Sequence, residues 1–496
     1  MDALSGLAMG FSVMLTPANL YYCFLGSLIG TMVGVLPGLG PLAALALLLP
    51  VTFTLSPLAG LAMLAAIFYG AMYGGSTTSI LVNIPGEAAS VITCLDGHQM
   101  ARQGRAGAAL GMAALGSFIA GTLSLVILTF FAPALAAIAI RFGPPENFGL
   151  MALGLVCTLF MITGSKLKGL LMIALGFLLS SVGMDMVNGN ERFTFGITNL
   201  TAGVELLSVV IGLFGISEIL LNVEKIVQNT LVTERIRKLL PTWADWKASF
   251  APILRGSGLG FLLGIVPGGG PITASFMSYA VERRMAREPE RFGQGAIEGV
   301  AGPESANNAA VAGSMIPLLS LGIPSNPITA LLLGALVIQG IQPGPLFITQ
   351  RPDLFWGVVA AMYIGNVMLL VLNMPLIGLW VQMLRIPYRF LFPLIVLLAM
   401  VGTYSANKNV FDLWMMLGFG VLGWLLRKLQ YDIAPFILAF VLAPLLEQSL
   451  RQSMTMSLDG AMILFQRPVS AGLVAASALL LVLMVIRQFT RKRGDS

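Results

Sequence analysis

A short octet rich in glycine and proline occurs twice in this sequence, as GVLPGLGP from Gly34 and as GIVPGGGP from Gly264, 230 positions later. Proline removes a backbone donor and clashes with the preceding helical turn, and glycine adopts backbone angles that other residues avoid. Each octet lies in an apolar run, so each is expected to break a helix at membrane depth. Irregular backbone is tolerated there only where it is buried in protein or lines a watery cavity. The octets therefore indicate a duplicated chain and a binding site at the breaks.

Composition places the chain in a membrane. Of its 496 residues 57% are hydrophobic and only 10% are charged. The many glycines and prolines of such an apolar chain indicate closely packed and interrupted membrane helices. The three cysteines are far apart and predict no disulfide framework. The net charge of +6 fits either attraction to an anionic solute or basic cytoplasmic loops.

The first half reads as a series of short and long apolar segments. Residues 1–16 predict an interfacial helix, and residues 21–49 predict a re-entrant hairpin broken at the first octet. Residues 58–75 can span the membrane, and a second broken stretch follows, with Pro85-Gly86 at its tip. Residues 97–105 are interpreted as a polar loop. The long polar segment 222–249 is interpreted as a linker between two halves.

The second half repeats this order. Gly313-Ser314 leads to Ile323-Pro324 much as Gly75-Ser76 leads to Ile84-Pro85. We therefore expect a first repeat at 1–221, a linker at 222–249, a second repeat at 250–452, and an additional transmembrane helix with a basic tail at 453–496. Basic residues are concentrated in the linker, beside the second hairpin and in the tail, whereas the loop 51–57 has none. The positive-inside rule then makes the repeats inverted, as in secondary transporters. The predicted fold is an all-α polytopic membrane protein with about 10–12 transmembrane helices, two inverted repeats and re-entrant Gly/Pro-tipped hairpins.

The hairpin tips are candidate anion sites. Backbone N–H groups freed beside helix N-termini bind a carboxylate without a charged side chain. The alternative is that the glycines serve helix packing or a tight turn. The candidate tip residues are Pro37, Gly38, Gly40, Pro267, Gly268, Gly269 and Gly270.

Polar side chains near the second break of each half are the other candidates. Their hydroxyl and amide groups can bind a carboxylate or complete the oxygen shell of a small cation, although serine and threonine in membrane helices also bond to their own preceding turn. Glu304, Asn307 and Asn308 share one helical face, and the alternative for Glu304 is a charge in the first turn of its helix. The expected solute ligands are Asn83, Asn307, Asn308, Ser325 and Asn326, and the expected cation ligands are Ser76, Thr77, Thr78, Glu304 and Ser320.

Several of these segments resemble a known family. GVLPGLGP, YGGSTTSILVNIPGEAASV, GIVPGGGP, PESANNAA and LGIPSNPITALLLGAL are similar to the large membrane subunit of the bacterial tripartite tricarboxylate transporters, the TctA family. The family signature Gly-x-x-Pro-Gly-x-Gly falls on Gly34, Pro37, Gly38 and Gly40, and again on Gly264, Pro267, Gly268 and Gly270. The resemblance implies a multi-pass secondary transporter of the bacterial inner membrane. It also implies two partners, a small membrane subunit and a periplasmic solute-binding protein that delivers a carboxylate.

Two other functions compete with this expectation. A membrane-embedded enzyme is disfavoured because the chain lacks HExxH, a P-loop and any intramembrane histidine or cysteine–histidine pairing. An anion-selective channel stays open, because re-entrant hairpins also occur in pores. The sequence predicts no cofactor, no nucleic-acid partner and no metal other than a coupling sodium ion. It leaves open which carboxylate is carried, whether sodium or protons drive uptake, and the oligomeric state.

Overall fold

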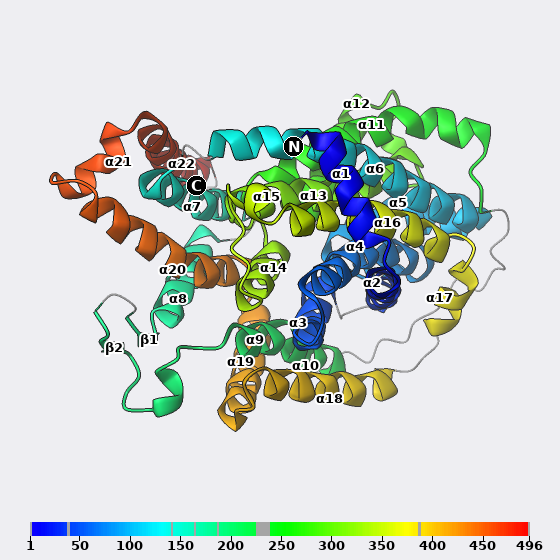
Figure 1. Ribbon diagram of the computed structural model, residues 1–496. Coiled ribbons are helices and arrows are strands. Elements are labelled where there is room, and N and C mark those ends of the chain that lie inside the picture. Colours follow the sequence, from blue (N-terminus) through cyan, green and yellow to red (C-terminus); the bar gives the residue numbers. More distant parts are fainter. Residues whose placement is uncertain are drawn as a thin grey trace.

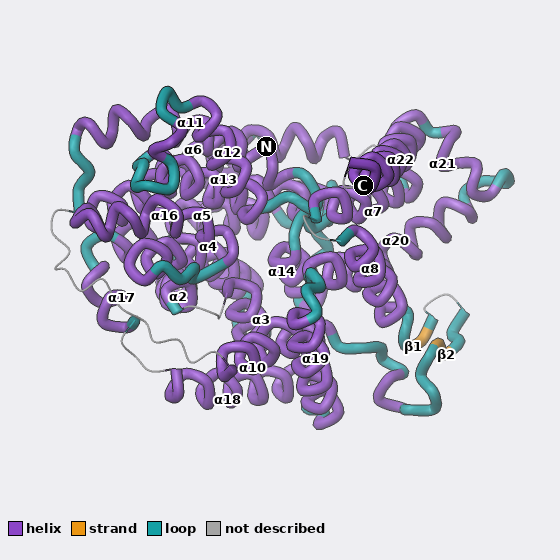
Figure 2. Tube along the Cα trace, turned by 180° about the vertical axis from the view of Figure 1, so that it is seen from behind, coloured by secondary structure: helices purple, strands orange, loops and turns teal. Residues whose placement is uncertain are grey.

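The computed structural model describes residues 2–36, 40–139, 142–162, 165–185, 188–224, 239–384 and 388–494. Within these ranges the regular secondary structure is almost entirely helical (Figures 1 and 2). The one sheet among them is a two-stranded antiparallel ribbon, in which β1 (Gly183–Met184) pairs with β2 (Glu191–Arg192). The expected all-α polytopic class is confirmed.

The helices that precede the linker form the first half of the chain. They are α1 (Ala3–Met14), α2 (Pro17–Val35), α3 (Gly40–Thr52), α4 (Pro57–Val82), η1 (Ala88–Ser90), α5 (Val91–Met100), η2 (Ala101–Arg105), α6 (Ala106–Ala139), α7 (Pro144–Met161), α8 (Lys166–Ser180), η3 (Thr198–Leu200), α9 (Leu206–Val210), η4 (Ile211–Ile216) and α10 (Ser217–Glu224).

The remaining helices follow the linker. They are α11 (Trp243–Ile265), α12 (Pro271–Met285), η5 (Pro289–Arg291), α13 (Glu298–Leu321), α14 (Pro327–Ile338), α15 (Phe347–Gln350), α16 (Pro352–Asn373), α17 (Ile377–Met383), α18 (Tyr388–Asn407), α19 (Val410–Lys428), α20 (Ala434–Thr455), η6 (Gly460–Met462), α21 (Ile463–Gln466) and α22 (Pro468–Gly494).

Seven helices in the described part of the chain are long and apolar enough to cross a membrane, and a bent pair after residue 460 brings the number to eight. Five shorter apolar helices, among them α3 and α14, accompany them. The expected 10–12 crossings are therefore reached only if short helices on either side of a break contribute to crossings.

Both octets interrupt a helix, as predicted. In the first half α2 ends at Val35 and α3 begins at Gly40, while Pro37 and Gly38 lie outside the described residues. In the second half α11 ends at Ile265 and α12 begins at Pro271. The second break of each half is also present, because α4 ends before Asn83 and α13 ends before Gly322.

Glycines explain why α2 packs so closely on α4 in the first half, and α11 on α13 in the second. A Cβ at Gly26, Gly30 or Gly34 of α2 would lie within 2.5 Å of a backbone oxygen of α4. A Cβ at the corresponding glycines of α11, which are Gly256, Gly260 and Gly264, would lie within 2.4 Å of a backbone oxygen of α13. Such small-residue stripes let membrane helices approach at backbone distance. Corresponding glycines in corresponding helices support the duplication.

Contacts between the two halves are reciprocal. Helix α4 of the first half packs on α16 of the second, and α13 of the second half packs on α6 of the first. In the same way α3 contacts α14, while α12 contacts η1 and α5. Reciprocal contacts are what a two-fold relation between similar units produces. In both views α7, α8 and α20–α22 gather on the side away from α1, α2 and α16, with α3 and α14 between these groups (Figures 1 and 2).

Two expectations about helix limits were wrong. The segment 97–105, expected as a polar loop, is helical in α5 and η2 apart from a kink at Gly104, where φ is 75°. Its polar groups bond to other parts of the chain: His98 Nδ1 lies 3.0 Å from the Ile80 carbonyl. Helix α11 starts at Trp243, within the expected linker, because Thr242 and Asp245 form a capping box there. Residues 225–238 of that linker lie outside the described residues.

Candidate functional site

The carboxyl group of Glu304 is the centre of a buried polar network. Glu304 is fully buried in α13 and accepts hydrogen bonds from Ser76 of α4 (2.6 Å) and from Thr93 of α5. Asn307, one turn further along α13, donates to the same carboxyl group at 3.2 Å. The network therefore joins helices from both halves of the chain. Glu304 is not a first-turn charge, since Glu298 occupies the first turn of α13.

The two asparagines extend this network toward α6. Asn308 donates through Nδ2 to Ser117 Oγ (2.7 Å), to Asn307 Oδ1 (2.6 Å) and to the Glu304 carbonyl (3.1 Å). Both asparagines are fully buried, and Asn308 Oδ1 has no hydrogen-bond partner among the described residues. The structure thus brings Ser76, Glu304, Asn307 and Asn308 together. An unpaired buried amide oxygen is costly unless a further group bonds to it.

A small cavity lies against this network. Its lining includes Ser76, Thr77 and Ser117 together with Tyr73 and Asn373. It has room for about one water molecule. Ser76 both lines the cavity and hydrogen-bonds to Glu304, so the buried carboxyl group is one hydrogen bond away from the cavity.

No cationic side chain pairs with Glu304 in the part of the chain that the structure describes. None of the ion pairs found between described residues involves Glu304. The described residues also contain no group of three His, Cys, Asp or Glu side chains suited to a metal ion. A solute bound here would meet hydroxyl, amide and carboxyl groups.

The tip of the second octet differs from the expectation of free N–H groups. Gly268 N donates to the Ser325 carbonyl (2.8 Å), Gly269 N to Val266 (2.9 Å) and Gly270 N to Leu263 (3.1 Å). The tip is a tight turn that satisfies its own donors, with Gly268 and Gly270 at φ of 81° and 103°. In this conformation the three N–H groups are not available to an anion. Pro267 packs against Gly154 of α7.

The tip also meets the second break of its own half. A Cβ at Gly270 would lie 3.3 Å from the Asn326 side chain. Asn326 caps α14 by accepting from Ile328 N and Thr329 N, and the buried Ser320 hydroxyl has no hydrogen-bond partner among the described residues. Ser325 and Asn326 thus hold the two breaks together and do not join the Glu304 network in any hydrogen bond that the structure describes.

In the first half the other predicted site residues do not lie together. Thr78 donates to the Val35 carbonyl (2.5 Å), which α2 leaves unbonded where it ends. Asn83 is exposed and adopts a left-handed conformation at the end of α4, so it lies outside the buried network. Gly40 starts α3 with a φ of 54° and open space around it.

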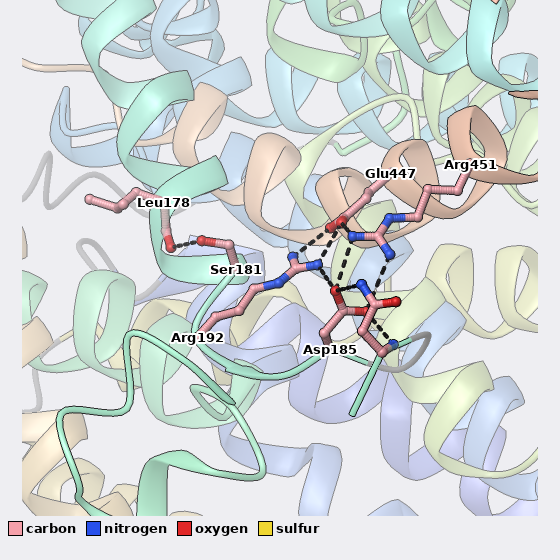
Figure 3. Close-up of polar contacts among 7 residues, drawn as sticks. Leu178, Ser181, Asp185, Arg192, Glu447 and Arg451 are labelled. Carbon is pink, nitrogen blue, oxygen red and sulfur yellow. Dashed lines mark hydrogen bonds and ion pairs between the residues drawn. The ribbon is translucent and has the colours of Figure 1, made fainter. Parts of the chain in front are cut away.

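A separate charged cluster lies at the end of α20 (Figure 3). Arg192 and Arg451 each pair with both Asp185 and Glu447, with Arg451 Nη2 at 3.0 Å from Asp185 and 2.7 Å from Glu447. Hydrogen bonds to Glu447 and Asp185 raise the pKa of Arg192, so its charge is permanent. The cluster fastens the β1–β2 ribbon to α20, and none of its charges takes part in the Glu304 network.

Sequence reasoning missed several members of the buried centre. Thr93 donates to Glu304, and Ser117 accepts from Asn308. Asn366 of α16 accepts from Tyr73 at 2.6 Å. Asn366 is a buried polar residue in an apolar helix, and that alone marks a functional candidate. Thr93 and Ser117 carry no such signal, because their partners are about 190 to 210 residues away in the sequence.

A polytopic helical protein with paired broken helices around a buried polar centre has the architecture of a membrane transporter. Comparison with known proteins agrees. Residues 20–438 match the tripartite tricarboxylate transporter TctA family, and the chain belongs to that family, which comprises the large subunits of tripartite tricarboxylate transporters.

Two relatives come from Agrobacterium vitis. The chain is 50% identical over 493 residues to an uncharacterized 52.8 kDa protein in the TAR-I ttuC' 3' region, covering 99% of this chain and 98% of that protein. It is 51% identical over 236 residues to an uncharacterized protein in the TAR-II ttuC' 3' region, covering 48% of this chain and 98% of that protein. No solved structure matches the chain significantly.

Proposed function

We propose that this protein is the permease subunit of a binding-protein-dependent importer of carboxylates, tricarboxylate-like solutes among them, in the bacterial inner membrane. It works by alternating access and is driven by a cation gradient. A small membrane subunit and a periplasmic solute-binding protein are its partners. The support for these partners is family membership.

The observation that carries the proposal is the buried network of Ser76, Glu304, Asn307 and Asn308, which lies beside a cavity on two helices, α4 and α13, that each end at a break. Amides offer donors to a carboxylate and acceptors to a cation, without the large cost of burying an unpaired charge. The Glu304 carboxyl group adds oxygen ligands, and a negative charge when it is ionised, for a cation that travels with the solute. Family membership and this chemistry point to the same class of cargo.

The test is uptake by the purified complex in proteoliposomes, with its own binding protein and a panel of radiolabelled di- and tricarboxylates. We expect saturable uptake that depends on the binding protein and collapses when the cation gradients are dissipated. Uptake that does not saturate, or that follows the solute's own electrochemical gradient alone, would identify a channel. Absence of uptake for the whole panel would reject carboxylates as the cargo.

A further inference from the structure

A second buried carboxyl group lies beside Glu304. Glu87, between the end of α4 and η1, is 6% exposed. One of its oxygens accepts from Ala89 N at 2.6 Å, and the other, Oε1, has no hydrogen-bond partner among the described residues. Oε1 is therefore a buried acceptor that can still take a proton or accept a hydrogen bond.

The same two segments hold both carboxyl groups. The Glu87 side chain packs against Gly75 of α4, and the next residue, Ser76, donates to Glu304. Ser90 hydrogen-bonds to the Glu87 backbone, and Thr93, three positions later and on the same helical face, donates to Glu304. The two carboxyl groups also interact electrostatically. They form one site, which we call the carboxyl pair.

The carboxyl pair has no cationic partner in the described ion pairs. The other titratable or charged side chains described on the helices around it are Tyr21, Tyr22 and Cys23 (α2), Tyr69 and Tyr73 (α4), Cys94, Asp96 and His98 (α5), Asp245, Lys247 and Arg255 (α11), Tyr279, Glu282, Arg283 and Arg284 (α12), Glu298 (α13), and Asp353 and Tyr363 (α16).

The acidic groups of that set have partners of their own. Glu282 pairs with Arg255, and Asp245 with Arg105. Glu298 lies 3.9 Å from Arg291, and Asp353 lies 2.9 Å from Arg351. Asp96 accepts from Tyr279 and from three backbone N–H groups. Glu87, Glu304 and Asp96 are thus the buried acids of this set without a cationic partner among the described ion pairs, and Glu87 and Glu304 are the two that the same segments hold together.

We propose that the carboxyl pair binds the coupling ion and that this ion is a proton. Two carboxyl groups in one buried site cannot both be charged without great cost, so the pair holds one exchangeable proton. The proton moves from water onto a carboxylate oxygen on one side of the membrane and returns to water on the other, and only O–H bonds form and break. The cavity lined by Ser76 gives water a place one hydrogen bond away from the Glu304 carboxyl group. This inference rests on the proposed transport function and adds the identity of the ion.

The first test needs no solute. Infrared difference spectra of the full-length protein between acid and alkaline pH should show the C=O band of a buried protonated carboxyl group. Glu87→Gln and Glu304→Gln each leave one carboxyl group of the pair, so we expect the coupled titration of that band to become a single step in either variant. Glu146→Gln removes another buried carboxyl group, which is 3% exposed and paired with Arg467, and should leave the band unchanged. A wild-type protein without such a band would overturn the proposal.

The second test uses proteoliposomes under a clamped membrane potential and the carboxylate that the wild type takes up best. A gradient of about one pH unit coupled to one proton sustains roughly tenfold accumulation. Glu87→Gln, which resembles the protonated form, should lose that accumulation but still exchange internal for external solute at equal pH. Glu146→Gln should accumulate solute as the wild type does.

The outcomes separate the two proposals. Wild-type accumulation driven by sodium and indifferent to the pH gradient would overturn the assignment of the proton and leave the transport function standing. Full pH-driven accumulation of solute by the Glu87→Gln variant would show that the carboxyl pair does not couple proton movement to transport. A wild type that transports no carboxylate would reject the proposed function, whereas the infrared result would still show whether the pair titrates.

Discussion

Asn308 uses its amide nitrogen to contact three oxygen atoms inside the protein, on Ser117, Asn307 and Glu304. Replacing Asn308 by Leu keeps a similar volume but removes these donors and the free Oδ1. We expect the loss of one such interaction to weaken solute or cation binding by about 1–3 kcal/mol, or roughly five- to 150-fold. The initial rate of uptake is measured against the concentrations of solute and of cation and normalised to the amount of folded protein. It gives the apparent affinities for both ligands.

Asn199→Leu is the matched control for this substitution, because Asn199 is exposed and bonds only to Asn409 among the described residues. The Asn199→Leu variant should bind solute and cation with the affinities of the wild type. If Asn308→Leu also binds both ligands normally at full rate, the asparagines serve helix packing alone.

Gly269 tests what the second hairpin tip does. A Cβ at this position would lie 2.0 Å from the Leu263 carbonyl, the group that accepts from Gly270 N. We expect Gly269→Ala to open the turn and lower the free energy of unfolding by about 1–3 kcal/mol, as overpacking does. A lowered midpoint of thermal unfolding in detergent supports a packing role. A variant that melts like the wild type but takes up no solute would instead indicate that the tip takes part in binding the solute.

At the scale of whole helices, the glycine stripe of α11 predicts a position-dependent effect of one methyl group. A Cβ at Gly260 would lie 2.1 Å from the Ala306 carbonyl, so Gly260→Ala should push α11 away from α13 and cost about 1–3 kcal/mol. Gly258 on the same helix is exposed, with nothing within 4 Å of a Cβ, and Gly258→Ala should be neutral or slightly stabilising. Equal melting temperatures for the two variants would contradict close packing of these helices.

Helix breaks were predictable because they depend on local chemistry. Where glycine and proline cluster they favour a break, so α2, α11 and α13 end close to the predicted breaks. Helix α4 runs past its expected limit at residue 75 and ends at Val82, just before the predicted tip at Pro85-Gly86. Isolated prolines such as Pro252 and Pro303 lie inside helices. The segment 97–105 was misread because its helix depends on distant groups: Asp96, next to it, accepts from Tyr279 and from backbone near residue 295.

The candidate site was predictable only in part for the same reason. Helical spacing placed Glu304, Asn307 and Asn308 on one face, but which helices face them is decided by tertiary packing. Thr93 is brought to Glu304 from 211 residues away. Glu87 is not among the predicted site residues, because nothing local in the sequence shows that a second carboxyl group lies beside it.

For the whole molecule the central prediction is that the two halves have opposite orientations in the membrane. The exposed positions Thr54 and Ala244 should then lie on opposite sides, with Thr54 periplasmic and Ala244 cytoplasmic, because basic residues gather near the latter. Cysteines are introduced singly at these positions in a chain whose three native cysteines are replaced. An impermeant thiol reagent should label Thr54→Cys in intact cells and Ala244→Cys only after the membrane is opened. Labelling of both from outside would show that the repeats are not inverted.

The packing of the first helices on α16 has a consequence for how the protein is made. The Cys23 thiol donates to the Ala361 carbonyl, 338 residues later in the chain, and Gly6 and Gly10 of α1 lie against Trp356. At roughly 5–20 residues per second, a ribosome needs roughly 17–70 s to make the chain between these partners. During that interval α1 and α2 are in the membrane without the helix that covers them, so lipid or an assembly factor must shield them. The first half therefore completes its structure only after most of the second half has been synthesised and inserted.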